Sequence, residues 1–242
     1  ATLSHKEHEL VIEFVIERAA GRIPVLAGTG SNSTSEAVSL TKSAQAAGAD
    51  GALVITPYYN KPPQEGLYSH FAAIAHECEL PIVLYNVPGR TGIDLLPQTV
   101  GRLAAIENVV AVKEASGSID RTVEILAECD ITVLSGDDSL TLSLMAVGAR
   151  GVISVAANVA PSQMAELVQL AASGDFASAG HLHHQLYPLM KGLFVETSPI
   201  PVKACLEIQG LIEGELRLPL VGAKDETRQL LRGVLAGLEI KV

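Results

Sequence analysis

Six short apolar runs, each followed by a stretch with helical spacing, constrain the fold of this chain most strongly. The runs are rich in Val, Ile, Leu and Ala and lack the alternation of polar and apolar residues seen in a strand with one face in water. Such runs are typical of parallel strands covered on both faces, and their alternation with helices indicates right-handed crossovers. We predict strands at residues 23–27, 51–56, 81–85, 109–112, 131–134 and 151–155.

Helical patterns fill the segments between and after these runs. The sequence also opens on a helix, because Ser4 and Glu7 have the spacing of a capping box and residues 10–15 supply an apolar face. Further helices are predicted at residues 36–47, 64–77, 97–105, 119–128, 139–147, 161–172, 176–194, 201–209 and 224–238.

The repeated strand-helix unit predicts an α/β fold, a TIM (β/α)8-type barrel, and 242 residues suit one such barrel better than two domains. A closed barrel has eight strands, of which six are visible here. We therefore expect an N-terminally incomplete barrel over residues 1–174 and a C-terminal helical extension over residues 175–242.

Composition limits the partners of this protein. A net charge of -10 argues against a surface for nucleic acid or for anionic membranes, and no apolar run reaches the ~20 residues of a membrane span. Cys78, Cys129 and Cys205 are odd in number and lack metal-site spacing, so neither a disulfide framework nor a zinc site is expected. We expect a cytoplasmic protein that acts on small molecules.

Reactive side chains of such barrels lie at the carboxyl ends of strands. Lys113 ends one run, and an apolar interior would lower the pKa of its amine and make it a nucleophile for a carbonyl carbon. Tyr85 ends the neighbouring run and could exchange protons with that amine, while Arg90 could bind a carboxylate. The alternatives are a lysine that extends into water, a packed tyrosine and a solvated arginine.

Three other features of the sequence could be taken for binding sites but have simpler structural interpretations. Residues 28–30 (Gly-Thr-Gly) lack the third glycine of a dinucleotide-binding loop, so we interpret them as a turn. Residues 137–138 (Asp-Asp) stand where a helix cap is expected, which we favour over a metal site. His181, His183 and His184 are better explained by a solvated or interface helix face than by a bound metal.

Four segments of the sequence carry distinctive motifs. They are Tyr-Tyr-Asn-Lys-Pro at 58–62, Tyr-Asn-Val-Pro-Gly-Arg-Thr at 85–91, Val-Lys-Glu-Ala-Ser-Gly at 112–117 and Pro-Ile-Pro-Val-Lys at 199–203. Together they resemble one known family, the dihydrodipicolinate (4-hydroxy-tetrahydrodipicolinate) synthases of the N-acetylneuraminate lyase and class I aldolase superfamily. The resemblance implies a Schiff-base lyase that condenses pyruvate with L-aspartate 4-semialdehyde in the diaminopimelate route of lysine biosynthesis. It also implies a homotetramer, built as a dimer of tight dimers, without a metal or organic cofactor.

The resemblance also assigns roles to residues. Lys113 would form the imine with pyruvate, Tyr85 would relay protons, and Tyr59 would reach across a tight-dimer interface into the neighbouring site. Three residues would bind or line the substrate site: Arg90, Ile153 and Gly136. Lysine-inhibited members hold L-lysine at the tight-dimer interface, and the matching positions are Ala1, His5, His8, Asn32, Glu36 and Tyr58. For His5 and His8, an exposed first helical turn is the alternative.

One segment of the family pattern is absent from this sequence. The family has Thr-Thr-Gly-Glu-Ser immediately before the stretch that resembles residues 1–3, so we expect two strands and one helix of the barrel to be missing here. Two other functions stay open: a catalytically impaired truncated homologue that acts only in assembly or binding, and another pyruvate-dependent class I aldolase.

Overall fold

The computed structural model describes residues 2–240, which form two compact units. The first unit contains Leu3–Gly136 and the short segment Val147–Ala149, and the second contains Asp137–Ala146 and the chain from Arg150 onward. This grouping by packing does not decide which segment folds by itself, so the predicted division at residues 174 and 175 stays a prediction.

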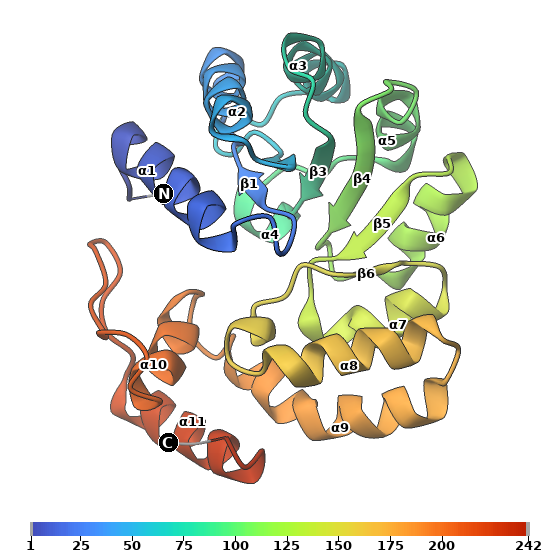
Figure 1. Cartoon of the computed structure of the whole chain (residues 1–242). Helices are drawn as coiled ribbons and strands as arrows, with labels where there is room; N and C mark the ends of the chain where they lie inside the picture. The colour runs from blue at the N-terminus through green and yellow to red at the C-terminus, as the bar shows by residue number, and fades with distance from the viewer. Residues whose placement is uncertain (1, 241–242) are drawn as a thin grey trace. The chain divides into compact units, whose positions relative to one another are not determined.

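A parallel sheet forms the centre of the first unit (Figure 1). Its strands pair in chain order, as expected when each strand returns through a helix to the next position in the sheet. The strands are β1 (Leu26–Gly28), β2 (Gly51–Ile55), β3 (Ile82–Asn86), β4 (Val109–Glu114) and β5 (Thr132–Ser135).

Helices cover one face of this sheet, where α1 packs against α2, α2 against α3, α3 against α5 and α5 against α6 (Figure 1). The predicted capping box is confirmed: the Glu7 amide donates to Ser4 Oγ at 3.3 Å, and the Ser4 amide donates to Glu7 Oε2 at 2.8 Å. The helices are α1 (His5–Ala19), α2 (Thr34–Ala47), α3 (Gln64–Glu77), α4 (Pro88–Thr91), α5 (Pro97–Leu103) and α6 (Ile119–Glu128).

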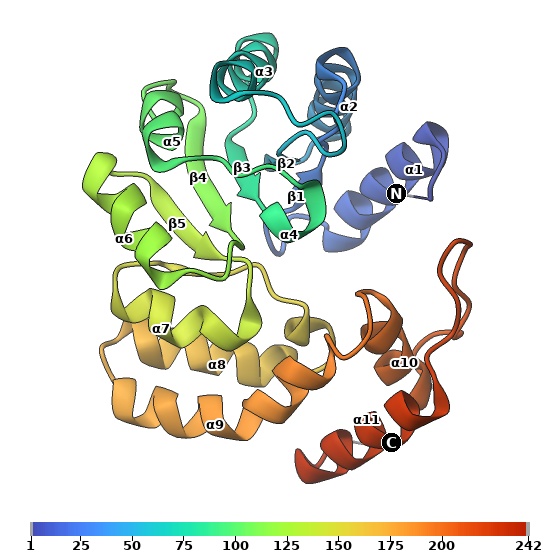
Figure 2. The same ribbon diagram turned by 180° about the vertical axis from the view of Figure 1, so that it is seen from behind.

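The second unit is mostly helical, and α8 packs against α9 and α10 against α11 (Figure 2). The Ser139 amide donates to Asp137 Oδ1 at 3.2 Å, which confirms the predicted helix cap. The elements are η1 (Asp138–Leu140), α7 (Thr141–Ala146), β6 (Gly151–Val152), η2 (Ala156–Asn158), α8 (Pro161–Ala172), α9 (Phe176–Gly192), α10 (Ile200–Ile208) and α11 (Asp225–Gly237). Between residues 2 and 240, none of the helices is long and apolar enough to cross a membrane.

The described chain thus has six strands, as predicted; each differs from its predicted bounds, and the first and the sixth differ most. The first begins at Leu26 instead of residue 23, because Pro24 has no amide hydrogen and the Val25 amide donates to Asp50 Oδ2 at 2.7 Å. The sixth ends at residue 152 because the amides of residues 155 and 156 donate to a carboxylate, Asp138 Oδ2, at 3.0 and 2.9 Å.

Two apolar surfaces are less covered than the sequence predicts. On the sheet, the face away from the helices is only partly buried within the described residues, so the expectation of two covered faces holds for the helix side alone. The apolar face expected on α1 is also exposed within this range, at Leu10, Val11, Phe14 and Val15.

Candidate functional site

A row of four side chains crosses the sheet on the face away from the helices. In register, Tyr85 on β3 pairs with Lys113 on β4, with Ile55 and Leu134 as the outer members of the row. All four are partly exposed, whereas the residue before each of them is fully buried against the helix layer. Alternation along the strands therefore separates a reactive face from a packing face.

Tyr85 and Lys113 are neighbours in register on β3 and β4, while the predicted hydrogen-bond reach between the amine and the phenol oxygen stays a prediction. Lys113 Nζ lies 4.2 Å from the centroid of the Tyr85 ring, within the range of a cation–π contact. Burial raises the pKa of the Tyr85 phenol, and the positive charge of Arg90 opposes this rise. The phenol is thus protonated at neutral pH and can donate a proton to an oxygen that leaves a carbon beside the amine.

Arg90 lies on α4, a single helical turn that the sequence analysis did not predict. Pro88 occupies the first turn and Gly92 ends it with a φ of 72°, so the two residues set where the turn begins and stops. The Arg90 amide donates to the Val87 carbonyl at 2.9 Å. The turn follows β3 directly and so holds an exposed guanidinium near the end of the strand that carries Tyr85.

Gly136 packs against the stem of Lys113. A Cβ atom at this position would lie 2.7 Å from Ala115 Cβ and 3.0 Å from Lys113 Cε, closer than real side chains allow. The Gly136 amide also donates to the Glu114 carbonyl at 2.7 Å, which fixes the approach. A residue without a side chain is therefore required here for Lys113 to keep its position.

Tyr59 and Ile153 stand on segments other than β3, β4 and α4. Tyr59 follows β2 in a loop, is 89% exposed and has a φ of 73°, a left-handed conformation that costs a bulky residue ~1–3 kcal/mol. Asn60 Nδ2 donates to the Asn32 carbonyl at 2.9 Å and holds this loop. Ile153 follows β6 in the second unit and is partly buried, and its predicted proximity to Lys113 stays a prediction.

Some of the expected effector residues meet between α1 and α2. His5 Nε2 lies 2.6 Å from Glu36 Oε1, and Ser31 donates to the other oxygen of that carboxylate. The bond from Ser31 lowers the pKa of Glu36; His5 also lowers it, while burial opposes both. A pocket of about 240 Å³ here is lined by His5, Glu9, Ser35, Glu36, Ser39 and Leu40.

The remaining effector positions lie on α1 and in two loops, or are not described. His8 Nε2 lies 2.8 Å from the Gly28 carbonyl oxygen, and Tyr58 is exposed in the loop after β2. Asn32 lies in the loop that precedes α2. Ala1 lies outside the described residues.

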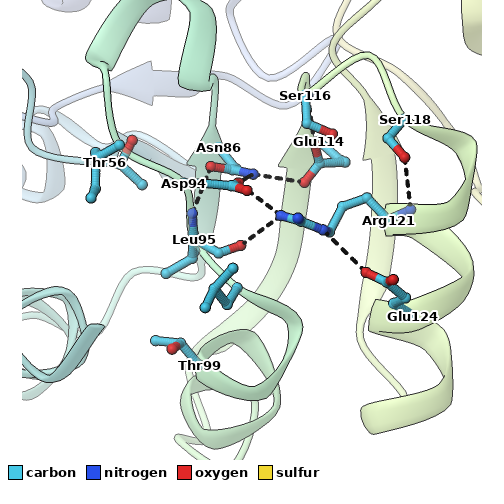
Figure 3. A network of polar contacts seen from close by, with 12 residues as sticks. Thr56, Asn86, Asp94, Leu95, Thr99, Glu114, Ser116, Ser118, Arg121 and Glu124 are labelled. Carbon is cyan, nitrogen blue, oxygen red and sulfur yellow. Dashed lines mark hydrogen bonds and ion pairs between the residues drawn. The ribbon is translucent and has the colours of Figure 1, made fainter. Parts of the chain in front are cut away.

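The sequence analysis missed a buried polar network on the other face of the sheet, formed by Asn86, Asp94, Glu114 and Arg121 (Figure 3). A signal for it existed, because two of these polar residues directly follow Tyr85 and Lys113 in apolar runs. As for metals, residues 2–240 contain no cluster of three His, Cys, Asp or Glu side chains with the geometry to hold an ion, and the prediction of a metal-free enzyme stays a prediction.

Comparisons with known proteins give one consistent result. A protein from Syntrophus aciditrophicus named 4-hydroxy-tetrahydrodipicolinate synthase is 51% identical over 97% of this chain and 81% of its own length. A protein of the same name from Syntrophobacter fumaroxidans is 53% identical over 96% of this chain and 81% of its own length. The crystal structure of a dihydrodipicolinate synthase from Aquifex aeolicus, 51% identical, matches all of this chain and 83% of that protein with a TM-score of 0.98.

Two similar crystal structures carry small molecules. The enzyme from Acinetobacter baumannii, described as chloride-inhibited, is complexed with pyruvate; it is 48% identical, with a TM-score of 0.95 over 99% of this chain and 83% of its own. The enzyme from Cyanidioschyzon merolae has lysine bound; it is 39% identical, with a TM-score of 0.96 over 99% of this chain and 82% of its own. The TIM-barrel prediction, with six strands present, is thereby confirmed.

The model of the dihydrodipicolinate synthetase family matches residues 1–237, nearly the whole chain. This chain belongs to that family of lyases.

Proposed function

We propose that this protein is a 4-hydroxy-tetrahydrodipicolinate synthase that condenses pyruvate with L-aspartate 4-semialdehyde. The observation that carries the proposal is the placement of Lys113 Nζ 4.2 Å from the Tyr85 ring centroid, in a chain about half identical to proteins of that name. An amine beside a protonated phenol is what imine formation with a keto acid requires.

In the first step, the Lys113 amine attacks the ketone carbon of pyruvate. A carbon–nitrogen bond forms, and the ketone oxygen takes up a proton to become the hydroxyl of a carbinolamine. This hydroxyl then leaves as water with a proton from the Tyr85 phenol, which is protonated at neutral pH. The result is an imine between the lysine nitrogen and pyruvate.

In the second step, the Tyr85 phenolate left by the first step takes a proton from the pyruvate methyl group, and the imine becomes an enamine. The enamine carbon attacks the aldehyde carbon of the semialdehyde, and the aldehyde oxygen takes up the proton from the phenol and becomes a hydroxyl. The carboxylate of this second substrate would pair with Arg90 on α4. The amino group of the second substrate then adds to the imine carbon, closes the ring and displaces the lysine amine. All bonds are made by Lys113, Tyr85 and the two substrates, so the proposed chemistry uses neither a metal nor an organic cofactor.

Turnover with matched variants tests this proposal. Purified protein is mixed with pyruvate and aspartate semialdehyde, and both substrates and the cyclic product are followed by NMR. Lys113→Arg retains the positive charge but removes the nucleophile, and we expect it to abolish product formation. Product from other aldehydes but not from the semialdehyde would indicate a different pyruvate-dependent aldolase, and folded protein with no product would indicate a binding or assembly role.

We also propose that L-lysine inhibits this enzyme through the pocket between α1 and α2. The ionised Glu36 suits the ammonium groups of a zwitterionic amino acid, and His5 lies beside it. In support, a related enzyme has been crystallised with lysine bound. We expect L-lysine to lower turnover and Glu36→Gln to weaken the effect; activity that stays flat to millimolar lysine would contradict the proposal.

The proposed assembly is a homotetramer, a dimer of tight dimers, located in the cytoplasm. The exposed, left-handed Tyr59 supports an interface, because a strained residue in a loop is better explained by a contact it serves than by solvent exposure. A monomeric variant of a dihydrodipicolinate synthase, 48% identical to this chain, is also known. Three unpaired cysteines fit a reducing compartment. Analytical ultracentrifugation at several concentrations decides the oligomeric state.

A further inference from the structure

A buried polar network lies directly behind the Lys113 and Tyr85 pair (Figure 3). Asn86 and Glu114 are the next residues along β3 and β4, are paired in register, and are 0% and 2% exposed. Because successive side chains of a strand point to opposite faces, this second pair points toward the helix layer. Each reactive residue is thus followed by a polar residue anchored on the other side of the sheet.

The side-chain amide of Asn86 fixes the far end of the segment that carries Arg90. Asn86 Oδ1 accepts the Leu95 amide at 3.0 Å, and Asn86 Nδ2 donates to Asp94 Oδ1 at 2.9 Å. Residues 87–93, which include α4 and Arg90, lie between these two attachment points. The chain therefore leaves β3 after Asn86 and is bound at residues 94 and 95 by the side chain of that same asparagine.

Glu114 connects this closed segment to the neighbouring strand. Its Oε2 accepts from Asn86 Nδ2 at 3.0 Å, and its Oε1 accepts the Ser116 amide at 2.6 Å. The position of Asn86 is thereby coupled to the residue that follows Lys113 in β4. Each oxygen of this buried carboxyl group thus accepts a hydrogen bond, as a buried polar group requires. Burial raises the pKa of Glu114, and the hydrogen bonds from Ser116 and Asn86 oppose the rise.

Arg121 on α6 supplies the positive charge of the network. Its Nη1 donates to Asp94 Oδ1 at 2.7 Å and to the Leu95 carbonyl at 3.4 Å, the same two residues that Asn86 holds. Arg121 Nε lies 3.4 Å from Glu124 Oε2, which orients the guanidinium from its own helix. The far end of the Arg90 segment is therefore held from both β3 and α6.

We propose that Asn86, with Glu114 and Arg121 behind it, is a positioning residue that sets the place of Arg90 relative to Lys113. The network closes the loop that carries Arg90, and its members Asn86 and Glu114 directly follow Tyr85 and Lys113 in their strands. This inference rests on the proposed function, in which Arg90 binds the carboxylate of the aldehyde substrate.

The chain contains a matched control at the opposite end of β4. Asn108 Nδ2 donates to the carbonyls of Ala75, Cys78 and Leu80 at 3.0, 3.0 and 3.3 Å, so this asparagine also closes a loop with its side-chain amide. It precedes the strand, however, and the amino ends of barrel strands serve stability, not catalysis. Asn86→Ala and Asn108→Ala each remove side-chain hydrogen bonds that close a loop, but only Asn86→Ala frees the Arg90 segment.

The test compares the steady-state kinetics of both variants with those of the unmutated protein. For Asn86→Ala we expect the KM for aspartate semialdehyde to rise about tenfold or more, because a small displacement of a binding group is costly. The rate at which pyruvate and borohydride label the protein should change much less. Asn108→Ala should be destabilised but keep both KM values.

Should Asn86→Ala fail to fold, Asp94→Asn is the second variant. It removes the charge of the same contact at nearly constant volume and is expected to shift the KM for aspartate semialdehyde in the same direction.

Three outcomes overturn the inference. An unchanged semialdehyde KM in folded Asn86→Ala contradicts it, as do equal effects of Asn86→Ala and Asn108→Ala on both substrates. A crystal structure of Asn86→Ala in which residues 87–93 stay in place contradicts it without any assay. In each of these cases the proposed function is still supported if the unmutated protein is labelled by pyruvate and turns over normally. If the unmutated protein shows neither labelling nor turnover, the proposed function and this inference are both wrong.

Discussion

The Tyr85 phenol is protonated at neutral pH, and burial raises its pKa further, an effect that Arg90 opposes. Lys113 lies against the ring of this tyrosine, and the row that contains both is the less buried face of the sheet. By contrast, Cys205 is fully buried, and burial raises the pKa of its thiol to about 11, so it is not a nucleophile at neutral pH. At the scale of residues, the environment singles out one amine and one phenol as the reactive pair.

Removing the phenol oxygen should slow catalysis while leaving the fold intact. We expect Tyr85→Phe to lower kcat by about 10²-fold or more, the usual contribution of a positioned proton donor. Tyr68→Phe is the matched control, because the Tyr68 ring, 4.1 Å from the Arg102 guanidinium, keeps its cation–π contact without the hydroxyl. Steady-state rates of both variants measure the effect, and equal rates for the two would contradict the role of Tyr85.

A methyl group at position 136 should displace the nucleophile. Gly136→Ala would place Cβ 3.0 Å from Lys113 Cε, so we expect pyruvate labelling and turnover to fall at least tenfold. Gly233→Ala is the control, because a Cβ there meets nothing within 4 Å. The labelling rate in borohydride measures the effect. Full labelling of folded Gly136→Ala would show that the Lys113 stem does not need this space.

At the scale of elements, the sequence predicts regular units well and their ends less well. The alternation of apolar runs and helices predicts the order of β1 to β5, because each run needs a helix to cover it. The same alternation cannot predict that the carboxylates of Asp50 and Asp138 accept hydrogen bonds from backbone amides that would otherwise extend β1 and β6. Each carboxylate is distant in sequence from the amide that it binds. For the same reason, the Asn86 and Glu114 network stayed hidden: local spacing does not show which polar groups meet across strands.

His70 on α3 makes a side-chain contact with α2, a helix that is distant from it in sequence. His70 Nδ1 lies 2.9 Å from Thr34 Oγ1 on α2, its side chain is buried, and burial lowers its pKa from 6.5 to about 4. Between pH 6.5 and pH 4, His70 is therefore protonated in the unfolded chain but not in the folded chain. Its contribution to stability is present above pH 6.5 and is lost as the pH falls toward 4. The shift corresponds to roughly 3 kcal/mol.

Urea unfolding at several pH values measures this contribution. The stability difference between the unmutated protein and His70→Gln should shrink by up to roughly 3 kcal/mol between pH 7 and pH 4. His76→Gln is the control for the substitution itself, because it lies at an exposed position of the same helix. Parallel pH curves for the unmutated protein and His70→Gln would contradict the account.

At the scale of the whole molecule, the function was inferred from three kinds of information. Composition and a net charge of -10 only narrowed the partners to small molecules. Strand ends pointed to Lys113 and Tyr85, and the structure places them together. The substrates themselves came from the resemblance of whole segments to one family, because a lysine and a tyrosine at a barrel rim serve several keto-acid reactions. The roles proposed for Tyr59, Ile153 and the effector residues also came from that resemblance, because spacing along one chain does not encode them.

The claim on which the whole account depends is that Lys113 forms a covalent imine with pyruvate. The direct measurement is incubation with pyruvate and borohydride, followed by intact mass and peptide mapping. We predict one reduced pyruvyl group per chain, located on Lys113 and absent from Lys113→Arg. A folded protein that gains no mass, or one that carries the group on a different lysine, would contradict the account.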